Sequence, residues 1–322
     1  MKSIALLLFL VCILSGCATS GHSPQGTTGS TFVSNADRRL FTLKAEKVWR
    51  LDQPNGVRFD ASGLLLRKTG ELWVVSDRGS RIYQIDLPDS GIATLASLPD
   101  FFPDLFMRQF LTNSRPDCEG LAQDENGFVY ICEESSRSIF RRHPDHPTPA
   151  RLAIDWTPVA RHFHPSDRNM SFEGIAQGQG KLWVVNERSD SRIIEIDLKN
   201  LKVIADFDLN PSNTLFGEVQ YSDLSWHGGY LYVLCRHHQA ILQMEPATRR
   251  VVAEFDYSQI EEAAENVYLR DFPTGTMEGL AVDSHYIWLI TDNNGKGRRQ
   301  DPADTRPTLF KCPRPDVPGS AQ

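Results

Sequence analysis

The feature that most constrains the fold is a sequence unit that recurs along the chain. A Glu-Gly-Leu-Ala run starts at Glu119 and leads through a turn into the apolar stretch FVYICEE, and the same order returns from Glu173 and Glu278. Two degenerate copies begin near Ser62 and near Asp223, so the key positions lie about 50 to 57 residues apart. A period of this length predicts one supersecondary unit per copy.

Each copy contains the same order of strand signals. A short apolar run leads into a turn, and a strongly β-prone run follows, as in ELWVVSD at 71–77, KLWVVNE at 181–187 and YIWLITD at 286–292. Short strands with Gly and Asn turns at regular spacing are typical of small antiparallel sheets repeated radially. The sequence therefore predicts an all-β fold, a β-propeller with five blades by repeat count, and a sixth, diverged blade is the alternative.

The ring also needs a closing strand, because an open blade would leave an unpaired sheet edge. The last repeat has few strand signals after residue 292. We expect the N-terminal segment FTLKAEKVWRL, at 41–51, to supply the outermost strand of that blade.

The N-terminus has the features of an export signal. Lys2 precedes an apolar run over residues 4–14, which is too short to remain as a spanning helix. The sequence LSGC at 14–17 resembles the bacterial lipobox, which implies cleavage before Cys17 and lipidation of that cysteine; an ordinary signal peptide with a chance cysteine is the alternative. The predicted organisation is a lipoprotein signal over 1–17, a flexible tether over 18–38, the propeller over 39–316 and a tail over 317–322.

These features predict a protein of the cell envelope that contacts the membrane through its N-terminal lipid only. Ala18 follows the cysteine, which indicates the periplasmic side of the outer membrane in a Gram-negative host. The chain has 34 basic and 41 acidic residues, a balance that argues against nucleic-acid binding. We expect a monomer.

Four cysteines remain in the exported domain, where disulfides can form. They are Cys118, Cys132, Cys235 and Cys312, and Cys118 and Cys132 flank one predicted hairpin that a disulfide could bridge. The sequence leaves the pairing open.

The hairpin geometry predicts where the recurring acids lie. The start of the first strand and the end of the second lie at the same end of a blade, so five blades gather these positions around one end of the ring. The expected neighbours are Glu119 with Glu134, Glu173 with Glu187, Glu278 with Asp292, Ser62 with Asp77, and Asp223 with Arg236.

Carboxylates this close repel one another unless a cation compensates them, and Ca²⁺ takes six to eight oxygen ligands. We expect a shared axial calcium site with these candidate ligands: Glu119, Glu173, Glu278, Asp223, Asp77 and Asp292. The glycine after each Glu is expected either to allow close backbone approach or to adopt a positive φ. In the alternative, the Glu side chains cap backbone N–H groups of the neighbouring blade.

A basic set interleaves with the acids. Arg78, Arg188, Arg236 and His237 are candidates to hold an anionic substrate, since Arg binds oxyanions bidentately, and Glu173 is a candidate catalytic residue as well as a metal ligand. Salt bridges on the rim are the alternative. The apolar insertion at 98–117 is expected to form a loop or lid over the end that carries Glu119.

The stretches ASGLLL, ELWVVSDRG, DCEGLA, SFEGIA and MEGLAVD together resemble the phytase-like family, also described as having esterase-like activity of phytase. The resemblance implies a secreted propeller with an axial calcium site and phosphoester hydrolysis. The matched positions are Ser62, Asp77, Arg78, Glu119, Glu173, Glu278 and Asp292. The chain lacks a Lys-rich phosphate cluster like that of alkaline phytases, which weighs against phytate itself.

The first hypothesis for function is therefore a calcium-dependent phosphoesterase or esterase acting on a small anionic molecule. The sequence contains no G-x-S-x-G motif, which favours metal-assisted attack by water over a serine nucleophile. The second hypothesis is a non-catalytic, calcium-stabilised propeller that binds a cell-envelope ligand or acts as a scaffold. The third is a lactonase-like hydrolase.

Overall fold

The computed structural model describes residues 38–111, 115–146, 148–187, 190–213, 217–270 and 275–317. Several predicted features lie outside the described residues: the signal segment with Cys17, the tether to residue 37, Arg188 and residues 318–322. Within the described ranges, no helix is both long and apolar enough to cross a membrane.

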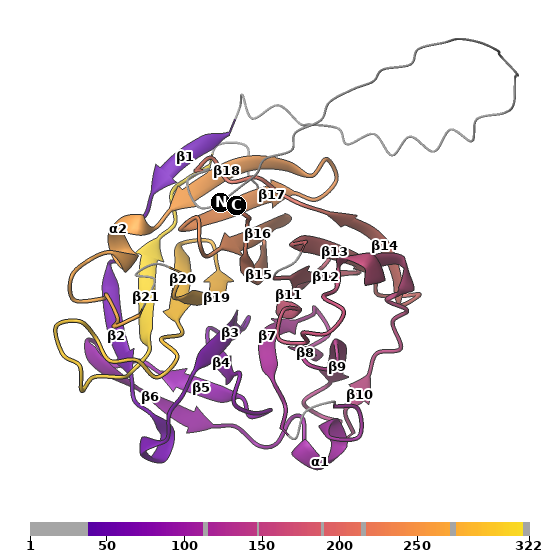
Figure 1. Ribbon diagram of the computed structural model, residues 1–322, viewed down its shortest axis with the longest axis horizontal. Helices are drawn as coiled ribbons and strands as arrows, with labels where there is room; N and C mark the ends of the chain where they lie inside the picture. Colours follow the sequence, from indigo (N-terminus) through magenta and orange to yellow (C-terminus); the bar gives the residue numbers. More distant parts are fainter. Residues whose placement is uncertain are drawn as a thin grey trace, which may run out of the picture. The chain divides into compact units, whose positions relative to one another are not determined.

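The β-prone runs form five antiparallel blades around a common centre (Figure 1). Blade 1 contains β3 (Ala61–Leu66), β4 (Leu72–Ser76), β5 (Tyr83–Asp86) and β6 (Gly91–Ser97). Blade 2 contains β7 (Cys118–Gln123), β8 (Val129–Glu133), β9 (Ser138–Arg142) and β10 (Ala150–Arg151). Blade 3 contains β11 (Phe172–Gly178), β12 (Lys181–Asn186), β13 (Arg192–Asp197) and β14 (Lys202–Phe207).

The remaining two blades each recruit a strand from the N-terminal segment. Blade 4 contains β15 (Tyr221–His227), β16 (Tyr230–Cys235), β17 (Ala240–Glu245), β18 (Arg250–Asp256) and the added β1 (Arg39–Thr42). Blade 5 contains β19 (Met277–Val282), β20 (Tyr286–Thr291), β21 (Thr308–Pro313) and the added β2 (Lys47–Leu51). Short helical turns in the connections are η2 (Pro54–Gly56), η3 (Thr157–His162) and α2 (Ser258–Glu261).

The innermost strands close the ring. Contacts run from β3 to β7, β11, β15 and β19 in turn, and β19 contacts β3 again. The prediction of a β-propeller with five blades is therefore confirmed, and the described chain contains no sixth blade.

The predicted closing strand is also confirmed. β2 pairs antiparallel with β21 and parallel with β6, so that blades 5 and 1 share a continuous eight-stranded sheet. The parallel addition of β1 to β18 was not predicted, because a four-residue strand carries too little periodicity to be recognised.

The apolar core consists of five buried clusters, one in each wedge between neighbouring blades. In the wedge between blades 3 and 4, Trp183 is fully buried and stacks on Trp226 at a centroid distance of 5.1 Å. Burying one large apolar side chain stabilises a fold by about 1.5–3 kcal/mol. The alternating apolar residues of the second strands therefore hold the blades together.

The insertion at 98–117 contributes to the core and does not form the predicted lid. Its helical turn α1 (Asp104–Met107) lies at the outer rim of the ring (Figure 1). Phe102 and Met107 are buried in the wedge between blades 1 and 2, where Trp73 packs edge-on against Phe101. The apolar character of the segment reflects this wedge packing.

The four cysteines are free and buried, so the candidate hairpin disulfide is not formed. Cys118 lies opposite Glu133 in the β7–β8 ladder, and Cys132 lies opposite Gly120. Their side chains belong to different apolar clusters, on opposite faces of the sheet. Two such cysteines cannot bridge without a change in backbone register.

Candidate metal centre at the acidic end of the ring

The end of the ring where the first strands start is called the acidic end here. In blade 2 the amide of Glu134, just after β8, donates to the carbonyl of Asp117, just before β7, at 2.9 Å. In blade 3 the amide of Glu187 donates in the same way to Ser171 at 2.8 Å. This recurring bond brings the residue after each second strand to the start of the first strand, as the hairpin geometry predicts.

A β-bulge places the motif side chain in each first strand. The β7–β8 register shifts between Cys118 and Gly120, so Glu119 has no partner across the ladder. The same shift leaves Glu278 unpaired in β19. Bulges redirect side chains and are frequent next to active sites, and here they direct the motif glutamates toward the acidic end.

The register changes the assignment in blade 4. There the shift falls between Tyr221 and Asp223, so Ser222 is the counterpart of the motif Glu and Asp223 stands at the glycine position. The Asp223 carboxylate accepts N–H groups from Leu280 at 2.8 Å and from Leu64 at 3.4 Å, in blades 5 and 1. This predicted metal ligand thus links three blades at the centre of the ring. Burial raises its pKa, although the amide bonds lower it.

The glycines after the motif residues lie where the first strands approach most closely. A Cβ added to Gly174 would lie 2.4 Å from the Cα of Asp223, and one on Gly63 would lie 2.6 Å from the Cα of Gly120. None of these glycines has a positive φ. Of the two predicted reasons for the glycine, close backbone approach is therefore correct.

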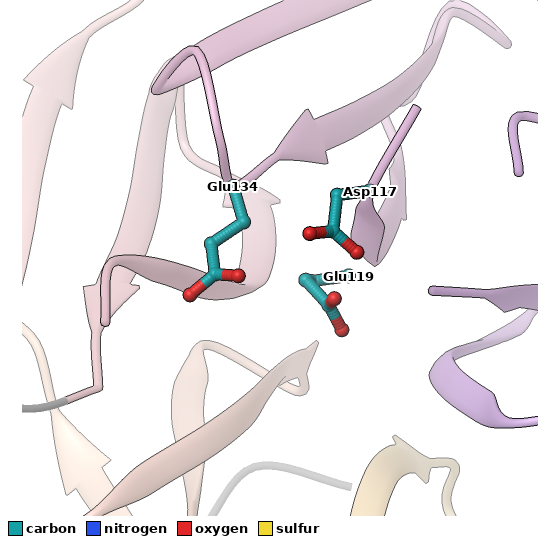
Figure 2. A group of neighbouring side chains, drawn as sticks. All are labelled: Asp117, Glu119 and Glu134. Carbon is teal, nitrogen blue, oxygen red and sulfur yellow. The ribbon is translucent and has the colours of Figure 1, made fainter. Parts of the chain in front are cut away.

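Two groups of carboxylates converge at the acidic end, between blades 2 and 3. The first group is Asp117, Glu119 and Glu134, which face one space in Figure 2. The second is Glu134, Glu173 and Glu187, and all three are buried. Within each group, one oxygen from each residue lies within 4.8 Å of the others. Glu134 belongs to both groups, so the five acids form one continuous cluster, called the acidic cluster below.

The acidic cluster is strongly perturbed. Burial raises the pKa of Glu119 well above its usual range, and Glu134 and Asp117 raise it further. Burial and Glu187 do the same to the pKa of Glu173. Burial, together with repulsion from Glu133, raises the pKa of Asp117 to about 6. Buried carboxylates crowded in this way favour the protonated form unless a cation compensates their charge.

Several contacts show which oxygens of the acidic cluster are already occupied. The Ser62 hydroxyl donates to Glu119 Oε2, and the Ser171 amide donates to Glu134 Oε1 at 2.9 Å. The amide group of Asn169 lies 3.3 Å from Asp117 and 3.2 Å from Glu134. With its nitrogen turned toward them, this amide donates to both acids.

The opposite side of the acidic end has its own cation. Arg236 donates through Nη2 to Glu187 and through Nη1 to Glu278, so one guanidinium joins blades 3 and 5. Burial lowers the pKa of Arg236, but Glu278 and Glu187 outweigh that effect and raise it. Burial also raises the pKa of Glu278 to about 7, although Arg236 lowers it.

A third set of acids lies between blades 5 and 1. Asp60 is paired with Arg58 at 2.6 Å and with Arg78 at 3.2 Å. Burial, with repulsion from Asp292 and Asp60, raises the pKa of Asp77 to about 8. Burial and Asp60 raise the pKa of Asp292 to about 6. Asp77 Oδ1 is buried without a hydrogen-bond partner among the described residues.

Comparison with known proteins agrees with this architecture. The sequence profile of the phytase-like family, described as esterase-like activity of phytase, matches residues 60–295. The chain belongs to the phytase-like family. No curated protein matches the sequence.

A solved structure supports the fold of this phytase-like protein. Glutaminyl cyclase from Myxococcus xanthus is 14% identical with a TM-score of 0.56, over 87% of this chain and 99% of that chain. Virginiamycin B lyase from Staphylococcus aureus is 14% identical with a TM-score of 0.41, over 86% and 76%. At 14% identity, the likeness to glutaminyl cyclase concerns the fold alone.

The remaining predicted site residues of the phytase-like chain lie around the acidic end in different surroundings. Arg78 keeps a third of its side chain exposed while it contacts Asp60. His237 is partly buried, and its ring lies against Gly275, where an added Cβ would be 2.7 Å from Cδ2. Arg188 lies outside the described residues. Glu278, Asp223, Asp77 and Asp292 do not join the acidic cluster.

Sequence reasoning did not select several residues that the structure brings to this end. Asp117 and Asn169 precede the motif glutamates of blades 2 and 3 by two and four residues, and Asp60 precedes Ser62 by two. Glu134 and Glu187 were expected only as neighbours of the motif residues. Both residues follow the second strand of their repeat directly, and an acid at that position is the sequence feature that could have identified them.

A cavity of about 550 Å³ opens at the other end of the ring, where the first strands finish. Its lining includes Gln123, Gln177, Trp226 and His227. No group of three converging metal-binding side chains lies there among the described residues. We place the candidate site at the acidic end because the perturbed and convergent groups gather there.

Proposed function

We propose that this phytase-like protein is a calcium-dependent hydrolase of phosphoester or ester bonds in small anionic molecules. One observation carries the proposal: five carboxylates converge between blades 2 and 3. In the described parts of the chain, Asp117, Glu119 and Glu173 form no ion pair with an Arg, Lys or His. The ion pairs at this end of the ring involve Asp60, Glu187 and Glu278.

The donor set suits a hard divalent cation. Ca²⁺ prefers six to eight oxygen ligands from carboxylates, carbonyls and water, whereas zinc prefers nitrogen and sulfur ligands. Asp117, Glu119, Glu134, Glu173 and Glu187 would hold the ion. A bound ion supplies Lewis-acid polarisation of an ester or phosphoester oxygen and activates water for attack.

The chain's own residues would orient the substrate. Arg78 keeps a third of its side chain exposed, and Asp60 is its one carboxylate partner among the described residues, so it can hold a substrate oxyanion from the blade 1 side. We retain Arg188 and His237 as candidates on sequence grounds. Arg236 is not available for this role, because both of its terminal nitrogens already bind carboxylates.

We further propose that the protein is attached to the cell envelope by a lipid on Cys17. The lipobox-like LSGC sequence and the Gly- and Ser-rich residues that follow it support this. Metabolic labelling with a tagged fatty acid tests it: the wild-type chain should take up label and Cys17→Ala should not.

The decisive experiment for the activity measures hydrolysis by the full-length chain with p-nitrophenyl phosphate, phytate and p-nitrophenyl acetate. Calcium should support turnover of at least one substrate, and EDTA should abolish it. Glu173→Gln should lower turnover by about 100-fold or more, since it removes a ligand. Glu195→Gln is the matched control, because Glu195 is a buried glutamate of the same blade that pairs with Lys181 away from the site.

Two results would reject the proposal. Turnover that persists in EDTA would remove the role of the metal. A calcium-dependent rise in Tm without turnover of any substrate would instead support the non-catalytic scaffold.

A further inference from the structure

Blade 4 departs from the repeat at both positions that reach the acidic end. Ser222 replaces the motif Glu that blades 2, 3 and 5 carry. Arg236 replaces the acid that follows the second strand in the other four blades. Blade 4 therefore presents one cation at the two positions where blades 2, 3 and 5 present carboxylates.

The side chain of Arg236 is held tightly. It is 9% exposed, and its Nη1 and Nη2 atoms donate to Glu278 and Glu187, which come from the blades on either side of blade 4. Its carbonyl also accepts the Tyr257 hydroxyl at 3.3 Å. A guanidinium that is held by two carboxylates and is covalently part of the chain cannot exchange with solvent as a free ion does.

We infer that Arg236 is a resident counter-cation that confines divalent-cation binding to the blade 2–3 side of the acidic end. This inference rests on the proposed calcium site. Arg236 neutralises one oxygen of Glu278 and one oxygen of Glu187, so these two oxygens no longer attract an ion. The acids without such a partner, Asp117, Glu119 and Glu173, are left to bind it.

The inference separates two glutamates that the repeat makes equivalent. Glu173 and Glu278 occupy the same motif position in blades 3 and 5. Only Glu173 belongs to the acidic cluster, while Glu278 is bound to Arg236. A ring of equivalent ligands would need both residues, whereas the asymmetric site needs only Glu173.

Isothermal titration of the full-length chain with Ca²⁺ tests this with a matched pair of variants. Glu173→Gln should weaken Ca²⁺ binding by about 100-fold or more, the larger end of what altered metal sites show. Glu278→Gln should leave the Kd within about twofold of the wild type, because its partner is Arg236. Equal losses in the two variants would overturn the inference and leave the calcium site itself intact.

A third variant tests the role of the cation directly. Arg236→Gln removes the positive charge beside Glu187 and Glu278, so the folded variant should bind one more equivalent of Ca²⁺ than the wild type. An unchanged stoichiometry, with circular dichroism showing a folded protein, would overturn the inference. If this variant does not fold, the comparison of Glu173→Gln with Glu278→Gln decides by itself. A wild-type chain that binds no Ca²⁺ would reject the proposed function and the inference together.

Discussion

Glu173 in blade 3 and Glu278 in blade 5 hold the same place in the repeat but lie in different electrostatic surroundings. Glu173 faces Glu134 and Glu187 in a group of converging carboxylates. Glu278 faces Arg236, which neutralises one of its oxygens. The difference arises in blade 4, where the basic residue Arg236 stands at the position that is acidic in the other four blades. A repeat therefore places side chains alike, while a single departure from it decides which of them can bind an ion.

The largest expected effect comes from removing the cation that sets this difference. In EDTA, Arg236→Ala should lower the free energy of unfolding by about 3–5 kcal/mol, because Glu187 and Glu278 are left buried without their partner. Urea denaturation measures this. Arg161→Ala is the control, since the Arg161 side chain is largely exposed and its pair with the partly buried Asp206 should contribute at most about 1 kcal/mol. Similar losses of unfolding free energy in the two variants would contradict the stabilising role of the buried Arg236 ion pairs.

The second prediction concerns the carboxylate that the two groups share. Glu134→Gln should weaken Ca²⁺ binding by about 100-fold, or about 2.8 kcal/mol, because both groups lose a donor. Calorimetric titration measures the change. Glu254→Gln, at a buried glutamate outside the acidic end that pairs with Arg38, should bind as the wild type does. Normal affinity in Glu134→Gln would place the ion elsewhere.

The third prediction separates the centre of the ring from the acidic end. Asp223→Asn should cost about 1–3 kcal/mol of stability, since one acceptor for the amides of Leu64 and Leu280 is replaced by a donor. Its Ca²⁺ affinity should remain that of the wild type. Chemical denaturation and calcium titration of the same preparation test both halves of the statement. Loss of affinity without loss of stability would return Asp223 to the set of ligands.

The smallest effect is a pH dependence of stability in EDTA. The pKa of Glu278 is raised by burial to about 7, so the folded protein holds this proton more tightly than the unfolded chain. The resulting stabilisation is complete below about pH 4.5 and is lost as pH rises to about 7. Asp77, with a pKa of about 8, extends the window upward.

The Tm in EDTA should therefore fall by at least about 4 °C between pH 5 and pH 8, equivalent to about 1–2 kcal/mol. Saturating Ca²⁺ should reduce this fall, because the ion competes with protons for the ionised carboxylates. Scanning calorimetry at several pH values checks both statements. A constant Tm in EDTA would show that the raised pKa values do not affect folding.

Much of the architecture could be predicted from the chain. The spacing of Glu119, Glu173 and Glu278 predicted five blades, and the β-prone segment before residue 51 predicted the closing strand. Both are local signals, since strand periodicity and repeat length depend on neighbouring residues. The approach of Glu119 to Glu134 also followed from hairpin geometry.

Other features were beyond this reasoning. The apolar insertion around Phe102 has the same sequence pattern whether it covers an end of the ring or fills a wedge between blades. Only its packing near Trp73 shows that it fills the wedge. Cys118 and Cys132 are close in sequence, yet the strand register places them on opposite faces. In blade 4, a one-residue shift in the bulge exchanges the places of Ser222 and Asp223.

By itself, the sequence determined the number of blades, the strand order within each blade and the end of the ring at which the acids gather. It could do so because these properties repeat, and five copies reinforce a weak local pattern. Only the tertiary structure decided which acids share a space and which are neutralised. Those outcomes depend on contacts between blades, such as Arg236 with Glu187 and Glu278, and charges from separate repeats meet only when the ring closes.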